Sequence, residues 1–261
     1  MVRIQKIFSE LILSRQLLTK LIRQQMILRY RRTFLGYLWT LVNPLLMIFI
    51  MGLVFSSLFK EDFLKFTAFL YAGMVPWNFI SSVVNQSGFA YTSNEALIKK
   101  IYIPKIIFPL SIVFTLFIDA IISLVILISL IIILGGNISW AIFFVPIALI
   151  IILIFAIGLG LIVSITTVFY RDIQYILTIA MQGIFFLTPV LYIKNTMPKS
   201  LSILISLNPL TPLIETFRNP ISYRLLPNYE TVFLAIIISF STLAIGLWML
   251  VSQEKKIVYR L

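Results

Sequence analysis

The sequence predicts an all-α integral membrane protein. Six transmembrane helices follow an amphipathic interface helix, and broken re-entrant outer helices lie between spans 5 and 6. Hydrophobic residues make up 61% of the 261 residues, charged residues 11%, and the mean hydropathy is +1.06. A water-soluble fold needs more charge on its surface than this. Six apolar runs also reach the ~20 residues that a helix needs to cross ~30 Å of hydrocarbon.

The chain divides into three regions. Residues 1–32 are predicted to form an amphipathic cytoplasmic interface segment, residues 33–251 a six-helix transmembrane domain, and residues 252–261 a cytoplasmic tail. Helices are expected throughout because lipid offers the backbone no hydrogen-bond partners. No cleavable signal peptide is predicted, since the first apolar run is too long for one. The predicted spans are 33–59, 66–89, 106–134, 141–169, 173–192 and 231–251.

The N-terminal segment has one apolar and one basic side in helical projection. The apolar side carries Leu17, Leu18, Leu21, Ile22 and Met26, and the other side Arg15, Gln16, Lys20, Arg23 and Gln24. Such a helix lies along a membrane surface. It is either a passive anchor or a part of gating or partner contact.

Three arginines, Arg29, Arg31 and Arg32, follow where the chain enters the bilayer. Arginines at this level either reach out to lipid phosphates or bind the pyrophosphate of a lipid-linked substrate.

Further along, residues 135–140 read GGNISW, which is a tight-turn signal. The third and fourth spans should therefore form an antiparallel hairpin.

Asp119 is the only ionisable residue deep within a predicted span. An unpaired carboxylate is costly there, so it should face the bundle interior, where it is either protonated or bound by polar groups. The interpretations are structural hydrogen bonding to Ser, Thr or Asn, or a direct role in transport.

Two loops are predicted on the cytoplasmic side. In the first, YTSNEALIKKIYIPK at 91–105, Asn94 can cap a short helix with Glu95 in its first turn and Lys99 and Lys100 near its end, before Pro104 stops it. The loop is either a connector or a handle that a partner could push. The second is the turn around Arg171 and Asp172, which could pair or cap the fifth helix.

The segment 185–223 is apolar but repeatedly interrupted by proline. Proline bends or ends a helix, so short helical pieces are expected here. Broken backbone at membrane depth is tolerated only where protein or a water-filled cavity satisfies it, which favours a transport pathway. The prolines are Pro189, Pro198, Pro209, Pro212 and Pro220.

Basic residues predict the orientation. Fifteen of the 21 fall on the side of both termini and six on the other, so both termini are expected to be cytoplasmic. The net charge of +12 is attributed to this bias and to anionic lipid, not to nucleic acid. The six on the opposite side are Lys60, Lys65, Lys194, Lys199, Arg218 and Arg224.

Enzyme signatures are missing from the sequence. There is no His and no Cys for metal ligation or nucleophilic catalysis, and no carboxylate pair at a useful spacing. No Gly-x4-Gly-Lys phosphate loop occurs, so the chain is not expected to hydrolyse ATP by that route. An ion-coupled carrier is disfavoured by the single intramembrane carboxylate and the absence of an inverted repeat.

Four collinear segments together resemble the ABC-2 type permease of polysaccharide exporters, which move O-antigen, capsule or teichoic acid. They cover nearly the whole chain. The segments are LRYRRTFLGYLWTLVNPLL at 28–46, LYAGMVPWNFI at 70–80 with NEALIKKIYIP at 94–104, YRDI at 170–173 with FFLTPVLY at 185–192, and LNPLTPLIETFR at 207–218.

The resemblance implies a six-helix subunit of the bacterial inner membrane. It implies a homodimer that works with two copies of a separate ATPase, which binds the ATP and Mg; no cofactor is expected on this chain. Contacts to that ATPase would come from Asn94, Glu95, Leu97, Ile98, Lys99, Lys100, Arg171 and Asp172.

The pathway residues are also expectations from the resemblance. The five prolines would lie in outer gate helices, and Arg29, Arg31 and Arg32 would hold the lipid pyrophosphate. Aromatic rings would stack on sugars, although an interfacial aromatic belt explains the same rings. The candidate rings are Tyr30, Phe34, Tyr37 and Trp39.

Two alternatives remain open at this stage. One is an ABC-2 exporter of a drug or a small lipid. The other is an integral membrane enzyme acting on a lipid-linked sugar, which would need catalytic groups that the sequence does not supply.

Overall fold

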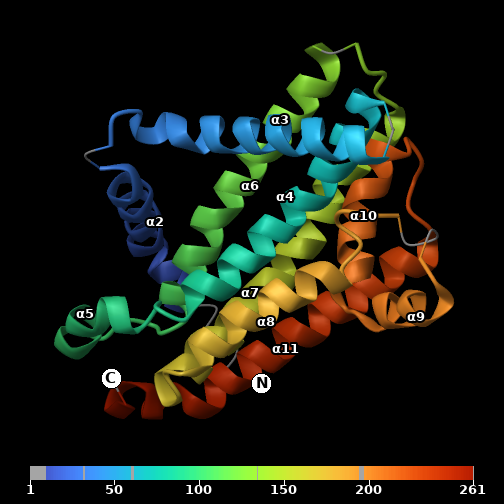
Figure 1. The fold of residues 1–261 in the computed structure, drawn as a ribbon. Helices are drawn as coiled ribbons and strands as arrows, with labels where there is room; N and C mark the ends of the chain where they lie inside the picture. Colours follow the sequence, from blue (N-terminus) through green and yellow to red (C-terminus); the bar gives the residue numbers. More distant parts are fainter. Residues whose placement is uncertain (1–9, 32, 60–61, 134, 194–196, 261) are drawn as a thin grey trace.

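The described part of the chain is built from helices packed side by side (Figure 1). The computed structural model describes residues 10–31, 33–59, 62–133, 135–193 and 197–260. Its α-helices are α2 (Arg15–Tyr30), α3 (Trp39–Phe59), α4 (Phe63–Ser87), α5 (Glu95–Lys100), α6 (Ile107–Ile133), α7 (Val145–Phe169), α8 (Ile173–Leu187), α9 (Lys199–Leu207), α10 (Leu210–Ser222) and α11 (Tyr229–Arg260). Short 3-10 turns, η1 (Gly36–Leu38), η2 (Thr92–Asn94) and η3 (Trp140–Phe144), precede α3, α5 and α7.

Five described segments are long and apolar enough to cross a membrane, and they correspond to predicted spans one to four and six. The predicted fifth span, 173–192, is only in part a helix. α8 has 15 residues, or about 22 Å at ~1.5 Å per residue, which is short of the ~30 Å of hydrocarbon. It ends at Leu187, and Pro189 lies in the turn that follows.

The ends of two other predicted segments also differ from the structure. The first span was expected from residue 33, but the helix begins at Trp39 after the turn η1. At the other end, α11 continues to Arg260, so the predicted tail 252–261 extends the last helix through its described residues.

The predicted hairpin between the third and fourth spans is confirmed. Gly135 in its turn has φ of +75°, a left-handed conformation that glycine adopts without steric cost.

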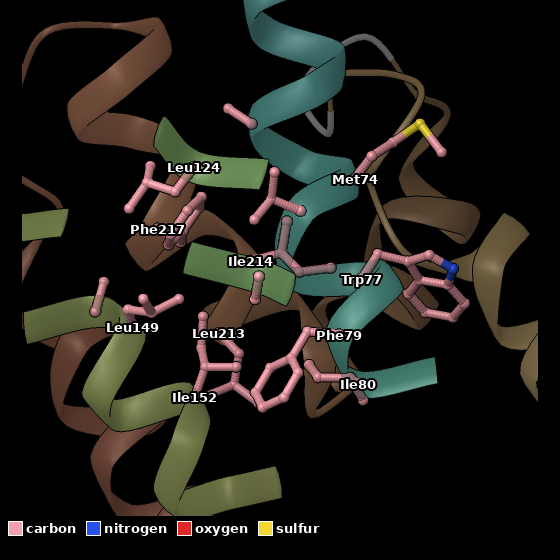
Figure 2. Packing of buried hydrophobic residues seen from close by; sticks show 14 of the residues in the cluster. Met74, Trp77, Phe79, Ile80, Leu124, Leu149, Ile152, Leu213, Ile214 and Phe217 are labelled. Atoms are coloured by element: carbon pink, nitrogen blue, oxygen red, sulfur yellow. The ribbon is translucent and has the colours of Figure 1, made fainter. Parts of the chain in front are cut away.

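The central core lies where α4, α6, α7 and α10 meet (Figure 2). Ile80 of α4, Ile152 of α7 and Phe217 of α10 are buried there. α10 therefore packs among the long helices although it follows the short helices α8 and α9. The sequence counted Arg218 in an outer loop, but Arg218 lies on this helix and is only 2% exposed.

α7 and α11 cross at close range. A Cβ atom on Gly158 of α7 would overlap the backbone of Thr242 and Leu243 of α11, and one on Gly246 would overlap the backbone of Gly158. Small residues allow helix backbones to approach in this way in membranes. The two helices are thereby held together near their middles.

A second buried cluster, here named the α5-end cluster, joins five elements at one end of the bundle. Its core includes Leu21 of α2, Ile98 of α5, Phe108 of α6, Ile165 of α7 and Ile257 of α11. α5 and the C-terminus lie at this same end (Figure 1). Movement of α5 would therefore press on packed side chains from four other helices.

Candidate transport groove

α4 carries a stripe of polar side chains along one face. Asn78, Ser81, Ser82, Asn85 and Gln86 occur at spacings of three and four residues, so they share a side of the helix. Residues between them, such as Ile80 and Val83, are fully buried in the core. The stripe consequently faces away from the core and toward the space between α4 and its other neighbours.

A cavity of about 430 Å³ lies against this stripe. α3 contributes Asn43 to its wall, α6 contributes Asp119 and Ser123, and Arg29 reaches in from α2. Polar side chains such as these can hold water in a space of this size.

Two further hollows adjoin the first and share its lining residues. One, of about 510 Å³, shares Arg29 and Gln86 and extends to Asn94 beside α5. The other, of about 390 Å³, shares Asn78 and Ser81 and extends to α8. We name the three together the α4 groove. It runs from the end of the bundle that bears α5 along the polar face of α4.

The α4 groove is bordered by a polar seam between α2 and α6. The Gln25 amide donates to Ser111 Oγ at 2.9 Å, and Thr115 Oγ1 donates to Gln25 Oε1 at 3.0 Å. One turn further along, Arg29 Nη1 forms an ion pair with Asp119 Oδ2. The structural interpretation of Asp119 predicted a bond to Ser, Thr or Asn, but its side-chain partner is an arginine from outside the spans; the alternative, a direct role in transport, stays a prediction.

The seam changes the interpretation of two predicted features. The apolar and basic sides of α2 are as predicted, because Leu21 is buried and Lys20 and Arg23 are exposed. However, α2 also packs along α6 through polar contacts. Arg29 neutralises Asp119 there, while Arg31 is exposed and Arg32 lies outside the described residues.

α8 is fixed to the polar stripe by two side chains. Gln174 Nε2 donates to the carbonyl oxygen of Asn85 at 2.8 Å. Thr178 Oγ1 donates to Asn85 Oδ1 at 3.0 Å. These bonds hold α8 against α4, and the two helices together line one of the three hollows of the groove.

The predicted short helix after the second span is confirmed as α5. Asn94 precedes it as expected but does not cap it; its side-chain amide donates to the carbonyl oxygen of Ala90. Lys99 pairs with Glu95 one turn earlier, and Lys100 is exposed. Ile98 is buried and Leu97 partly buried, so one side of α5 is anchored and the other faces out.

The predicted second contact, Arg171 and Asp172, forms an exposed turn before α8. Asp172 stands at the N-cap position without a side-chain cap bond.

Lys105 lies just before the start of α6 and is buried. Burial lowers the pKa of Lys105, and the charge of Glu254 acts against this shift. Lys105 Nζ donates to the carbonyl oxygen of Ile103 at 3.1 Å.

Of the predicted pathway aromatics, the structure brings one to the groove. Trp39 lines the first cavity, whereas Phe34 is 100% exposed before the start of α3. The side chains of Tyr30 and Tyr37 lie outside the described part of the structure.

The five prolines punctuate the chain between α8 and α11, and short helices form here as predicted. Pro198 and Pro209 occupy the positions just before α9 and α10. Pro212 lies in the first turn of α10, and Pro220 lies inside its last turns. Arg218 Nη1 donates to the carbonyl oxygen of Pro189, which ties α10 to the turn after α8.

Sequence reasoning missed the α4 stripe. Its signal was present in the polar residues of FISSVVNQSG at 79–88 and in the low hydropathy of the second span, 1.2 against 2.1 to 3.2 for the other four. Among the residues that the structure describes, no group of three or more Asp or Glu side chains could hold a metal.

These features define a multi-span helical membrane protein with a polar groove between its helices. The family model described as ABC-2 type transporter matches residues 16–221. The chain belongs to this family.

Its relatives include O-antigen export permeases and a polysialic acid transport protein. An O-antigen export system permease protein RfbA of Klebsiella pneumoniae is 29% identical over 88% of this chain and 89% of its own length. The RfbA of Myxococcus xanthus is 29% identical over 86% of this chain and 87% of its own. The polysialic acid transport protein KpsM of Escherichia coli is 25% identical over 97% of this chain and 95% of its own.

Proposed function

We propose that this chain is the membrane-spanning subunit of an ATP-driven exporter that carries a lipid-linked polysaccharide across the bacterial inner membrane. The α4 groove is the observation that carries the proposal. A hydrophilic polymer does not dissolve in hydrocarbon and needs hydrogen-bonding groups along its path. Asn, Ser and Gln side chains on α4 supply uncharged donors and acceptors that suit hydroxyl-rich sugars.

The lipid-linked end of the substrate would enter beside α2. Arg29 lines both the first and second hollows, and Arg31 follows on the exposed side. An arriving pyrophosphate would compete with Asp119 for Arg29, since a guanidinium binds phosphate and carboxylate through the same fork of N–H groups. Arg32 would add a third cation at this entrance.

The energy would come from a separate ATPase acting on α5. The exposed side of α5 offers the charged residues Lys99 and Lys100, and its buried side contacts the α5-end cluster. Force applied there would reach α2, α6 and α11 through packed side chains. Arg171 and Asp172 would form a second contact with the same partner.

Two copies of the chain would face each other across the path. α3 exposes a long apolar face, including Leu45, Phe49 and Leu53, to lipid or a second copy. The α4 groove lies beside α3 and would then open toward the dimer axis. The short helix α9, which follows the proline-broken turn, would gate the far end, and α10 would anchor it to the core.

Ser82→Leu tests the groove directly. We expect it to lower ATP-driven movement of lipid-linked polysaccharide into proteoliposomes at least roughly tenfold, because it fills a polar wall with an apolar side chain. The chain would be reconstituted with the proposed partner ATPase. Ser241→Leu, on a lipid-exposed side of α11, is the matched control and should leave transport unchanged.

Two results would overturn this proposal. One is equal transport by the two variants. The other is purification of the chain without an ATPase and with its own turnover of a lipid-linked sugar, which would favour the enzyme alternative. Transport of a drug or small lipid with no transport of polymer would keep the ABC-2 mechanism and reject the substrate.

A further inference from the structure

A separate cleft lies at the end of the bundle opposite α5, and it shares no lining residue with the α4 groove. It has a volume of about 550 Å³. The start of α4, the segment after α8 and the end of α10 meet there (Figure 1).

The walls of the cleft are apolar and largely aromatic. Phe66 and Phe69 of α4 lie with their ring centroids 6.2 Å apart, and Tyr223 packs edge-on to Phe69 at 6.2 Å. Leu191 and Met197 come from the segment after α8. Walls of this composition accept a hydrocarbon chain.

Cations surround these walls. Lys65 and Arg224 line the cleft and are exposed. The guanidinium of Arg218 lies 4.3 Å from the centre of the Phe69 ring behind that wall, where the charge of Glu215 acts on it. The cations at the cleft itself are therefore Lys65 and Arg224. No Asp or Glu is among the described residues that line the cleft. The site thus attracts an anion next to an apolar slot.

Two local features support a polar ligand at this edge. Arg224 has φ of +59°, a left-handed conformation that costs energy for a residue with a Cβ. Ser222 also lines the cleft, and its hydroxyl is buried with no hydrogen-bond partner in the described structure. A buried hydroxyl without a partner is uncommon and gains from a ligand that bonds it.

We propose that this cleft binds an anionic phospholipid. Its phosphate lies at the edge formed by Lys65 and Arg224, and an acyl chain lies along Phe66, Phe69 and Leu191. Lys65 opens the candidate span Lys65–Ser87, so the cleft lies where hydrocarbon gives way to headgroups. A phospholipid presents its phosphate and its chains at this depth.

The test compares lipid retention by the full-length chain in mild detergent. Native mass spectrometry would count phosphatidylglycerol and phosphatidylcholine of identical chains bound per protein. We expect a preference for phosphatidylglycerol, and we expect Lys65→Gln with Arg224→Gln to weaken its retention roughly fivefold for each cation removed. The matched control is Lys199→Gln with Lys256→Gln, two exposed cations outside the cleft, which should retain the lipid.

A second variant distinguishes a loss of lipid binding from a folding defect. Ile193→Glu places a carboxylate at the cleft without removing a buried side chain, since Ile193 is 42% exposed. It should also reduce phosphatidylglycerol binding while thermal unfolding stays near that of the parent chain.

Three outcomes would refute the assignment. They are equal retention of the two phospholipids, equal losses in the cleft and control variants, and displacement of phosphatidylglycerol by equimolar polyprenyl phosphate. A change of oligomeric mass in Ile193→Glu would instead assign the cleft to a second copy of the chain. None of these results depends on polysaccharide transport, so the proposed function is tested separately.

Discussion

Arg29 and Asp119 neutralise each other across the contact between α2 and α6. Each side chain is about a quarter exposed, at 27% and 25%. A charge left there without its partner would lie in a partly hydrated groove between helices, which is less favourable than bulk water. The pair therefore removes the cost of an intramembrane carboxylate and anchors α2 at the same time.

We expect Asp119→Asn or Arg29→Gln alone to lower the free energy of unfolding by about 1–3 kcal/mol, below the ~3–5 kcal/mol typical of a fully buried pair because both groups meet some water. The double variant should cost less than the sum of the two, since no charge is left alone. Thermal unfolding of the purified chain measures this cycle. Arg23→Gln, on the exposed side of α2, is the control; strictly additive losses would contradict the coupling.

The sequence identified Asp119 as exceptional but not its partner. The residues are 90 positions apart, and nothing in local spacing relates them. The α4 stripe has a readable spacing of three and four residues, but spacing alone does not show whether a polar helix face borders a groove or another helix. Apolar composition predicts that a helix spans the membrane, whereas contacts between helices depend on tertiary packing.

At the level of elements, α10 shows why a proline-rich segment need not be a surface loop. Pro209 and Pro212 stand at its start, where a missing backbone N–H costs little. The rest of the helix buries Leu213, Ile214 and Phe217 in the core. Short pieces were predicted from the prolines, but the sequence could not show that one of them enters the bundle.

The crossing of α7 and α11 provides a sharp test of packing. Gly158→Leu should lower the free energy of unfolding by about 1–3 kcal/mol or more, because its side chain has no space against the backbone of α11. Gly183→Ala in α8 is the control; a Cβ there meets no atom within 4 Å, so the change should be neutral or stabilising by up to about 1 kcal/mol. Thermal unfolding in detergent compares them. Equal stability of the two variants would rule out the close crossing.

Across the whole molecule, the coupling role proposed for α5 rests on its position at one end of the bundle, with one side in the α5-end cluster and the other exposed. The Glu95–Lys99 pair on its surface is worth only about 0.3–0.5 kcal/mol to the helix itself. The pair therefore contributes little to the stability of α5, and we expect the charges on its exposed side to matter more for contact with a partner.

Charge reversal at α5 tests this role. We expect Lys99→Glu to reduce both co-purification with the proposed ATPase and substrate-stimulated hydrolysis about tenfold, since a like charge placed at a contact costs more than the ~1.4 kcal/mol that a factor of ten represents. Lys199→Glu, at the other end of the bundle, is the control. The swap Glu95→Lys with Lys99→Glu restores the pair within the helix but not the outward charge pattern. Rescue by the swap would mean that only helix stability is involved and would reject α5 as a docking surface.

The Arg29–Asp119 pair also constrains the order in which the protein is made. α2 leaves the ribosome well before α6, so Asp119 reaches the membrane when Arg29 has already been in place for some 90 residues of synthesis. Until the two meet, α6 carries its carboxylate alone, at a cost of ~2.5–3.5 kcal/mol on insertion scales. α6 has 27 residues, and an 18-residue window within it reaches a mean hydropathy of 3.0, so the helix can offset that cost by itself. α6 can thus insert into the membrane first, and α2 can pack against it afterwards through the Arg29–Asp119 pair.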